Sequence, residues 1–420
     1  MAKFCARAPF SFVPMSGFIR LHRRSSISVV LIVIALIFID GTRAQQIQQQ
    51  PAQRPRRVAG SEQTTEAKKG TAPDDLDEGD VIRTDTQLVS VPAVVTDASG
   101  RPLSGLKPEN FRLIEDGQPQ TIANFGTTET PFEIALLLDT SGSTRDDVAL
   151  IRSAANSFIE ALRPGDRVGI VSFNQPQTFG DPVATVDVLS PLTGDREALR
   201  TAIDNLGASQ GTPYYDALER VADGIFHDPP KEDVRGRRAV VALTDGVDSS
   251  SNSDFVTAKM KLARAGIACY FIQVNTEDFV EDRLMKDCQD DGQLSLSKRQ
   301  IERYRQIFFP KAKAESFDSF CKMGPFERMS ISRELYSLAR REMNDLARGS
   351  GGRSFEAATL ADARAALARV AADIGTQYSL GYYPTNKARD GKFRSIKLEV
   401  RGLKEKTQIR ARDGYYAPKQ

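Results

Sequence analysis

Small oxygen-bearing side chains directly follow a strongly apolar run of the sequence. Residues 136–138 are all leucine, and Asp139, Ser141 and Ser143 come immediately after them. The side chains of alternate residues can face one point where a chain turns from strand to helix, and Gly142 permits a tight turn there. Carboxylate and hydroxyl oxygens are ligands for hard divalent cations. The segment therefore predicts part of a cation site.

Two later segments carry donors of the same kind. Thr212 lies between a polar loop and a helical pattern, where we expect it to open a helix at the surface, and Asp245 follows the apolar run R-A-V-V-A-L. Ligands of open parallel sheets bind at the carboxyl ends of the strands. The expected fold therefore brings both residues to the same edge as Asp139, Ser141 and Ser143. No donor is His or Cys, so Mg²⁺, Mn²⁺ or Ca²⁺ is favoured over zinc.

Helix capping is the alternative explanation for these residues. Asp, Ser and Thr between a strand and a helix are common N-caps, so the first segment alone fits either interpretation. Thr212 and Asp245 shift the balance towards metal binding. Asp248 and the serines after it fit a solvated loop or a helix cap better than further ligands. Tyr214 and Tyr215 could border the binding face or pack in the core.

Continuous apolar runs alternate with amphipathic helical patterns through residues 131–375. The runs are F-E-I-A-L-L-L, R-V-G-I-V-S-F, R-A-V-V-A-L and A-C-Y-F-I-Q-V, and G-G-R-S-F-E-A adds an edge strand. This rhythm predicts a doubly wound, mainly parallel sheet with helices on both faces. Residues 277–330 break the rhythm and indicate an insertion with its own helix near residues 299–307. Further helices are expected at residues 332–348 and 360–374.

Segments with strand-like alternation flank this region at residues 82–127 and 378–420. The N-terminal segment fits three or four antiparallel strands, which are few for an independent sandwich. We therefore predict that the two chain ends pair into one small antiparallel β-sandwich. The fold class predicted for the whole chain is α/β, with the mainly parallel domain inserted into that sandwich.

Residues 1–44 have the pattern of a signal peptide. Basic residues precede an apolar run at residues 27–39, which is shorter than the about twenty residues of a bilayer span, and T-R-A follows at residues 42–44. The alternative is an uncleaved signal anchor, the one case in which we expect membrane attachment. Residues 45–80 have the composition of a disordered linker. We expect a periplasmic, cell-envelope or extracellular protein.

The four cysteines fit an exported chain. Cys5 precedes the apolar run of the signal, and Cys269 lies in the pattern of a buried strand. Cys288 and Cys321 both lie in the polar insertion. Because oxidising compartments permit disulfides, we predict a bridge between these two residues, with two free thiols as the alternative.

The three donor segments resemble the metal-ion-dependent adhesion site of the von Willebrand factor A domain family. D-T-S-G-S at residues 139–143, G-T at 211–212 and T-D-G at 244–246 follow the order of that site. The resemblance covers about residues 131–375. The E-D-G-Q-P-Q and L-G-Y-Y-P segments outside it resemble exported bacterial proteins of this family, whereas the insertion departs from a minimal A domain.

The resemblance also implies a role for each donor. Ser141, Ser143 and Thr212 would contact the metal directly, while Asp139 and Asp245 would act largely through water. A carboxylate of a protein partner would complete the coordination shell. This implies an exported, adhesion-type protein-binding module. The alternative is a structural component of the cell envelope whose A domain no longer binds metal.

Other classes of function receive little support. The 57 basic and 55 acidic residues give a net charge of +2, which is no signature of a nucleic-acid-binding protein. The sequence contains no Walker A or dinucleotide-binding motif, so nucleotide binding is disfavoured. A Ser–His–acid hydrolase would depend on His227, and the chain has no G-x-S-x-G segment. We therefore expect a protein that is not an enzyme.

Overall fold

The chain divides into two units, Met1–Asp80 and Val81–Gln420. The computed structural model describes parts of the second unit only, namely residues 88–127, 129–141, 148–174, 184–209, 211–229, 237–285, 296–311, 323–403 and 406–419. The predicted signal segment, the linker, Ser143 and the Cys288–Cys321 bridge lie outside these residues and stay predictions. Within the described ranges, no helix has both the length and the apolar character needed to cross a bilayer.

A six-stranded sheet in the order β10-β9-β8-β5-β6-β7 organises the α/β domain. Its strands are β5 (Glu133–Leu138), β6 (Arg167–Asn174), β7 (Thr185–Thr193), β8 (Arg238–Thr244), β9 (Ala268–Val274) and β10 (Arg353–Ala357). All neighbours pair in parallel except β6 and β7. Every residue of β5, β8 and β9 is buried, which explains their continuous apolar runs. The predicted fold class is confirmed.

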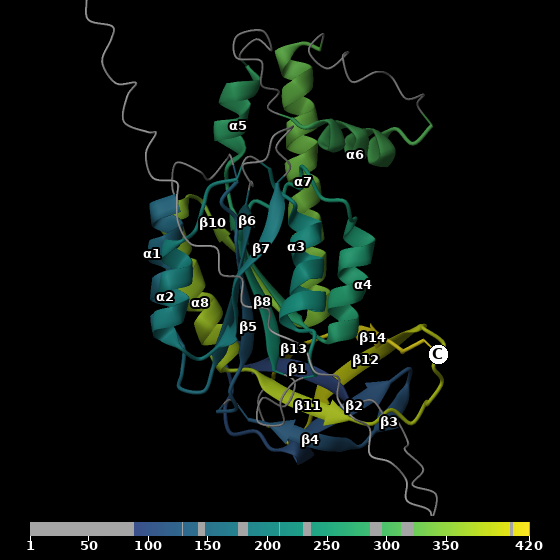
Figure 1. Cartoon of the computed structure of the whole chain (residues 1–420). Coiled ribbons are helices and arrows are strands. Elements are labelled where there is room, and N and C mark those ends of the chain that lie inside the picture. Colours follow the sequence, from purple (N-terminus) through teal and green to yellow (C-terminus); the bar gives the residue numbers. More distant parts are fainter. Residues whose placement is uncertain are drawn as a thin grey trace, which may run out of the picture. The chain divides into compact units, whose positions relative to one another are not determined.

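Helices cover both faces of this sheet (Figure 1). One face packs against α1 (Val148–Ala161), α2 (Arg196–Asp204) and α8 (Ala363–Gly375), with the short η5 (Leu360–Asp362) before α8. The other packs against α3 (Tyr214–Arg220), its π-helical continuation η3 (Val221–Ile225), α4 (Phe255–Ala265) and α7 (Pro325–Ser350). Alternate residues of β5 serve the two cores: Leu136 and Leu138 face the first group, and Ala135 and Leu137 the second.

The insertion contributes α5 (Glu277–Leu284), α6 (Lys298–Phe308) and the start of α7. The helix predicted near residues 299–307 corresponds to α6. The start predicted for α7, residue 332, is wrong: the helix begins at Pro325 after the N-cap Gly324. Proline suits a first helical turn because its missing N–H would have no partner there.

Strand β7 has no counterpart among the predicted strands. It is an antiparallel edge strand whose pairing with β6 shifts register between Val168 and Val171. Most of its residues are half-buried or exposed, and it contains Pro191. Its partial exposure explains why β7 lacks the continuous apolar run that identifies its buried neighbours. Pro191 is tolerated because the strand lies at the edge of the sheet, where a missing N–H donor costs no ladder bond.

The two chain ends form two four-stranded antiparallel sheets, β13-β1-β11-β4 and β14-β12-β2-β3. The N-terminal elements are β1 (Val89–Thr96), η1 (Pro108–Asn110), β2 (Phe111–Glu115), β3 (Gln118–Gln120) and β4 (Ile122–Gly126), and the C-terminal ones are β11 (Tyr378–Tyr382), β12 (Phe393–Val400), β13 (Gln408–Ala411) and β14 (Gly414–Tyr416). Side chains of both sheets share one apolar core. Strand β1 lies between β11 and β13, and β2 pairs with β12, so each end supplies the partners of the other.

Arg412 joins the sandwich to the α/β domain. Its guanidinium donates hydrogen bonds to three carbonyl oxygens: Ser90 in β1 at 3.0 Å, Ala263 in α4 at 2.6 Å and Gly414 at 2.8 Å. The side chain is buried, and burial lowers the pKa of Arg412 to about 10. Because buried carbonyls need donors, this residue fixes the end of α4 against β1.

We predict that removing residues 378–420 exposes the N-terminal strands to proteolysis. Strand β1 would lose both neighbours, β4 its partner β11 and β2 its longest partner, so that of the four N-terminal strands only β2 and β3 would stay paired, and the core would be divided. Limited proteolysis with mass spectrometry should show early cleavage within residues 88–127, while the full chain resists. Equal protease resistance of these residues in both proteins would contradict the pairing of the two ends.

Candidate metal site

Asp139 and Asp245 lie at the carboxyl ends of adjacent parallel strands. Leu138 of β5 is in register with Leu243 of β8, so the residues after each strand meet. The Asp139 N–H donates to the carbonyl of Leu243 at 3.0 Å, and the Thr244 hydroxyl donates to Asp139 Oδ2 at 2.6 Å. Asp139 and Asp245 are only 1% and 5% exposed. The sheet therefore places two buried carboxyl groups beside each other.

The two carboxyl groups disfavour each other's charge. Burial raises the pKa of Asp139, and the negative charge of Asp245 raises it further. Hydrogen bonds from Ser141 and Thr244 act in the opposite direction. A cation between the two aspartates would stabilise both ionised forms, because opposite charge lowers a carboxyl pKa. The chemistry and burial of these side chains thus fit a divalent cation.

Hydrogen bonds join the three donor segments to one another. The Ser209 N–H donates to the Thr140 carbonyl at 2.8 Å, which links the first segment to the second. The Thr212 N–H donates to Ser249 Oγ at 2.8 Å, which links the second to the loop after Asp245. The Thr244–Asp139 bond closes the set. Of the five predicted donors, the structure brings Asp139, Ser141, Thr212 and Asp245 to one edge, whereas Ser143 lies outside the described residues.

Thr212 is buried rather than at the surface. Its exposure is 7%, so the expectation of a surface position is wrong. The loop after β8 packs against it, since Ser249 also donates its N–H to the Thr212 carbonyl at 3.0 Å. The preceding Gly211 has no spare room, because a Cβ there would lie 2.9 Å from the Cβ of Ala184. The Ser249 loop therefore packs against Thr212, and the residue before it, Gly211, packs against Ala184.

The loop at residues 248–251 caps helix α3. Pro213, at the N-cap position, offers no side-chain acceptor. Asp248 Oδ1 instead accepts the Tyr214 N–H at 3.0 Å, and Ser251 Oγ accepts the N–H groups of Tyr215 and Asp216 at 2.9 and 3.2 Å. Burial raises the pKa of Asp248 to about 6. The helix cap expected as one role of this loop is confirmed; its capping residues Asp248 and Ser251 are buried, and Ser249 and Ser250 are half-buried.

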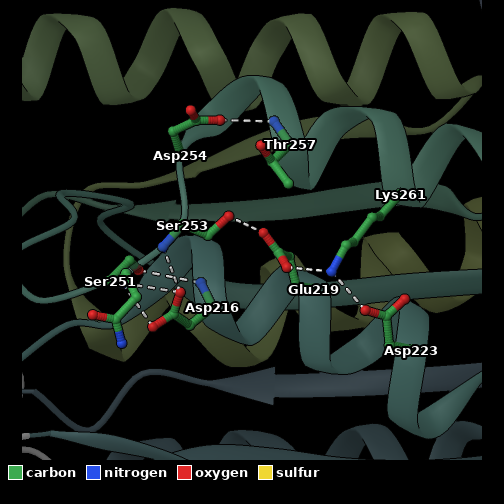
Figure 2. Close-up of polar contacts among 9 residues, drawn as sticks. Asp216, Glu219, Asp223, Ser251, Ser253, Asp254, Thr257 and Lys261 are labelled. Carbon is green, nitrogen blue, oxygen red and sulfur yellow. Dashed lines mark hydrogen bonds and ion pairs between the residues drawn. The ribbon is translucent and has the colours of Figure 1, made fainter.

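Acidic side chains of α3 hold the other end of the same loop (Figure 2). The Asp216 carboxylate accepts the Ser253 N–H at 2.8 Å, and Glu219 accepts the Ser253 hydroxyl. Lys261 of α4 pairs with Glu219 and, at 2.7 Å, with Asp223. These acids therefore have structural partners. Across the described residues, no group of three or more His, Cys, Asp or Glu side chains has a metal-binding arrangement.

Two hydroxyl groups from the segments that flank the insertion, Thr276 and Tyr336, lead to Asp245. Thr276 donates to Asp245 Oδ2 at 2.6 Å, and its oxygen lies 2.8 Å from the hydroxyl of Tyr336 in α7. A threonine hydroxyl has one proton, which Asp245 receives, so Tyr336 must donate to Thr276. Helix α7 also touches the next residue, since a Cβ on Gly246 would lie 2.7 Å from Met343 Cε. Sequence patterns gave no signal for these contacts, which join residues far apart in the chain.

Tyr214 and Tyr215 pack in the core, each only 1% exposed. The Tyr215 hydroxyl donates to Glu342 at 2.7 Å, and Arg303 lies over its ring at 4.7 Å. Core packing is therefore the correct one of their two interpretations.

His227 is exposed at the end of η3. The preceding residue, Phe226, accepts a hydrogen bond from Arg238, the first residue of β8. His227 thus lies next to the amino end of the sheet, and Ser141 lies at the opposite, carboxyl end.

Part of the chain matches a known domain family. Residues 134–247 match the family model of the von Willebrand factor type A domain, a segment that includes Asp139, Thr212 and Asp245. The six-stranded sheet with helices on both faces is the corresponding architecture. None of the curated proteins compared matches the chain.

Several solved structures show weak likeness. Proximal thread matrix protein 1 from the mussel byssus is 13% identical, with a TM-score of 0.36, over 69% of this chain and 51% of that one. In a second crystal form of that protein the match covers 38% of its chain, so this chain spans about half of its length or less. A von Willebrand factor type A protein from Catenulispora acidiphila is 10% identical, with a TM-score of 0.37, over 80% and 74% of the two chains. The SpRpn10 VWA domain is 16% identical, with a TM-score of 0.27, over 34% and 76%. These values are too low to transfer a function.

Proposed function

We propose that this protein is an exported module that binds another protein through a divalent cation. A von Willebrand factor type A domain in itself suggests a protein-interaction module. The observation that carries the metal-dependent part is the pair of buried carboxyl groups, Asp139 and Asp245, beside the hydroxyl-bearing Ser141 and Thr212. An all-oxygen donor set suits Mg²⁺, with Mn²⁺ or Ca²⁺ as alternatives.

The charged and the neutral donors would have different roles. Asp139 and Asp245 supply the negative charge that a dication needs, and the neutral hydroxyls of Ser141, Ser143 and Thr212 would contact it. When bound, the cation would supply an open coordination position for a carboxylate oxygen of the partner.

A structural cell-envelope component without metal is the second candidate. It is favoured by the hydroxyls of Thr244 and Thr276, which already donate to the two carboxyl groups. We do not propose an enzyme. A serine hydrolase would need a histidine beside Ser141 at the carboxyl end of the sheet, but His227, the only histidine after the signal segment, follows Phe226, whose carbonyl accepts a hydrogen bond from Arg238 at the amino end. Export itself is proposed from the pattern of residues 1–44.

We predict that the exported chain binds one Mg²⁺ or Mn²⁺ and that Asp245→Asn abolishes this binding. At a Mg²⁺ concentration of 100 times Kd, the wild type should gain about 2.7 kcal/mol in the free energy of unfolding, and the variant nothing. In chelator, the variant should be at least as stable as the wild type, because the charge facing Asp139 is gone. Calorimetry and thermal unfolding measure both effects. Asp254→Asn, which keeps its capping oxygen, is the control, and a wild type that binds neither metal would exclude the cation site.

We predict that Tyr336→Phe weakens Mg²⁺ binding about tenfold, since partners that orient a ligand from outside the coordination shell have effects of this order. Without the Tyr336 proton, Thr276 loses the bond that directs its hydroxyl towards Asp245. Tyr304→Phe, in α6 of the insertion, is the control. Mn²⁺ titration gives the affinity, and unfolding in chelator checks the fold. Equal affinity in all three proteins would show that the Thr276–Tyr336 pair does not orient Asp245.

We predict that a protein partner captured from native envelope extract is retained with Mg²⁺ and released by chelator. Thr212→Ala should lose the partner, whereas Thr212→Ser, which keeps the hydroxyl, should retain it. Burial of Thr212 means that Ala also removes packing, so the melting temperature of each variant must be measured beside its binding. A partner held equally with Mg²⁺, with chelator and by Thr212→Ala would bind elsewhere on the protein.

A further inference from the structure

A cavity lies at the amino end of the central sheet, whereas the candidate metal site lies at the carboxyl end. Its volume is about 410 Å³, within the range of small-molecule sites. The lining residues Glu133, Arg167 and Arg238 are the first residues of β5, β6 and β8. The apolar part of the wall comes from β7 and the α3–η3 helix: Val188, Pro191, Leu192 and Ile225.

Two arginines share one buried carboxylate in this cavity. Glu133 is 1% exposed, and its two oxygens accept hydrogen bonds from Arg167 Nη2 and, at 2.7 Å, from Arg238 Nε. Arg167 and Arg238 together carry one more charge than Glu133, and Asp228 of the same lining supplies a second negative charge that acts on Arg238. Burial, and then the charge of Arg167, lower the pKa of Arg238 to about 10, whereas the negative charge of Asp228 acts in the opposite direction.

Arg220 and Asp228 are the other charged residues in the described part of the lining. Arg220 projects from the end of α3, is exposed, and forms no ion pair with any residue that the structure describes. Asp228 is the second acid of the lining. Among the described residues of the lining, three arginines thus face two carboxylates, which leaves a surplus of one positive charge, that of the exposed Arg220. A monoanion matches this surplus, whereas a phosphate dianion would exceed it.

We propose that this cavity binds a small carboxylic acid with an apolar body. The carboxylate would lie among Arg167, Arg220 and Arg238, where charge-assisted hydrogen bonds are strong and directional. The hydrocarbon would pack against Val188 and Ile225. Both a free organic acid and the terminal carboxylate of a peptide have this chemistry. The site is independent of the metal and of its proposed partner.

The test compares acids with their uncharged amides on the full chain in the presence of chelator. Hexanoate and hexanamide represent a free acid, and N-acetylleucine and its amide represent a peptide end. We expect saturable binding of at least one acid, seen by calorimetry and by NMR shifts, with about millimolar Kd for ligands this small. The matching amide should bind at least tenfold more weakly.

Three variants locate the site. Arg220→Gln should weaken acid binding about tenfold, the scale of one charge-assisted hydrogen bond. Gly224→Leu should abolish it by filling the cavity, since a Cβ at this lining residue meets only the flexible side chain of Arg220. Arg200→Gln, on α2 at the other face of the sheet, should bind like the wild type. Amides binding as well as acids, absence of saturable binding, or unchanged binding by Arg220→Gln and Gly224→Leu would overturn the proposal.

Discussion

The burial of two like charges at the ends of adjacent strands is the constraint on which the site depends. A carboxylate removed from water is stable only if donors or an opposite charge compensate for the lost hydration. Asp139 receives the Ser141 N–H and the Thr244 hydroxyl, and Asp245 receives the Val247 N–H and the Thr276 hydroxyl. These donors hold the carboxyl groups in place, yet they leave the repulsion between them. Such pre-organised repulsion is what a cation-binding site requires.

The donors of the two aspartates come from different parts of the chain. Thr244, which supports Asp139, is the last residue of β8 and belongs to the sheet itself. Thr276, which supports Asp245, follows β9 and takes its own hydrogen bond from α7. Asp139 is therefore fixed by the strands, whereas the orientation of Asp245 depends on how α7 packs. Helix α7, whose first turns belong to the insertion, in this way supports the candidate site through Tyr336.

The sequence predicted those parts of the site that depend on strand ends. Apolar runs buried on both faces identify β5 and β8, and the residue that follows such a run must lie at the carboxyl edge, so the convergence of Asp139 and Asp245 was foreseeable. Thr212 was placed at the edge correctly but assigned the wrong exposure. Its burial comes from the loop after β8, more than thirty residues further along, and no local pattern records that contact.

Other features were beyond sequence patterns for a related reason. The Thr276–Tyr336 bond joins residues 60 positions apart, and either hydroxyl alone looks like an ordinary loop or helix residue. Asp248 resembles a cap for a following helix, but it caps α3, which precedes it in the chain. Edge strand β7 escaped because it lacks a continuous apolar run. Periodicity reports which face of an element is buried, but it does not identify the partner that buries it.

Opposite charges at the two ends of one sheet complete the electrostatic arrangement. Asp139 and Asp245 lie at the carboxyl end, whereas Arg167 and Arg238 lie at the amino end. Helix α3 with η3 runs between these ends, from Thr212 to the residue that Arg238 contacts. Its positive N-terminal end therefore approaches the aspartates and its negative C-terminal end the arginines, each worth about 0.3–1 kcal/mol in exposed settings. The helix thus partly neutralises both clusters. The carboxyl end keeps a negative charge that a cation would offset, and the amino end keeps a positive charge that a small anion would offset.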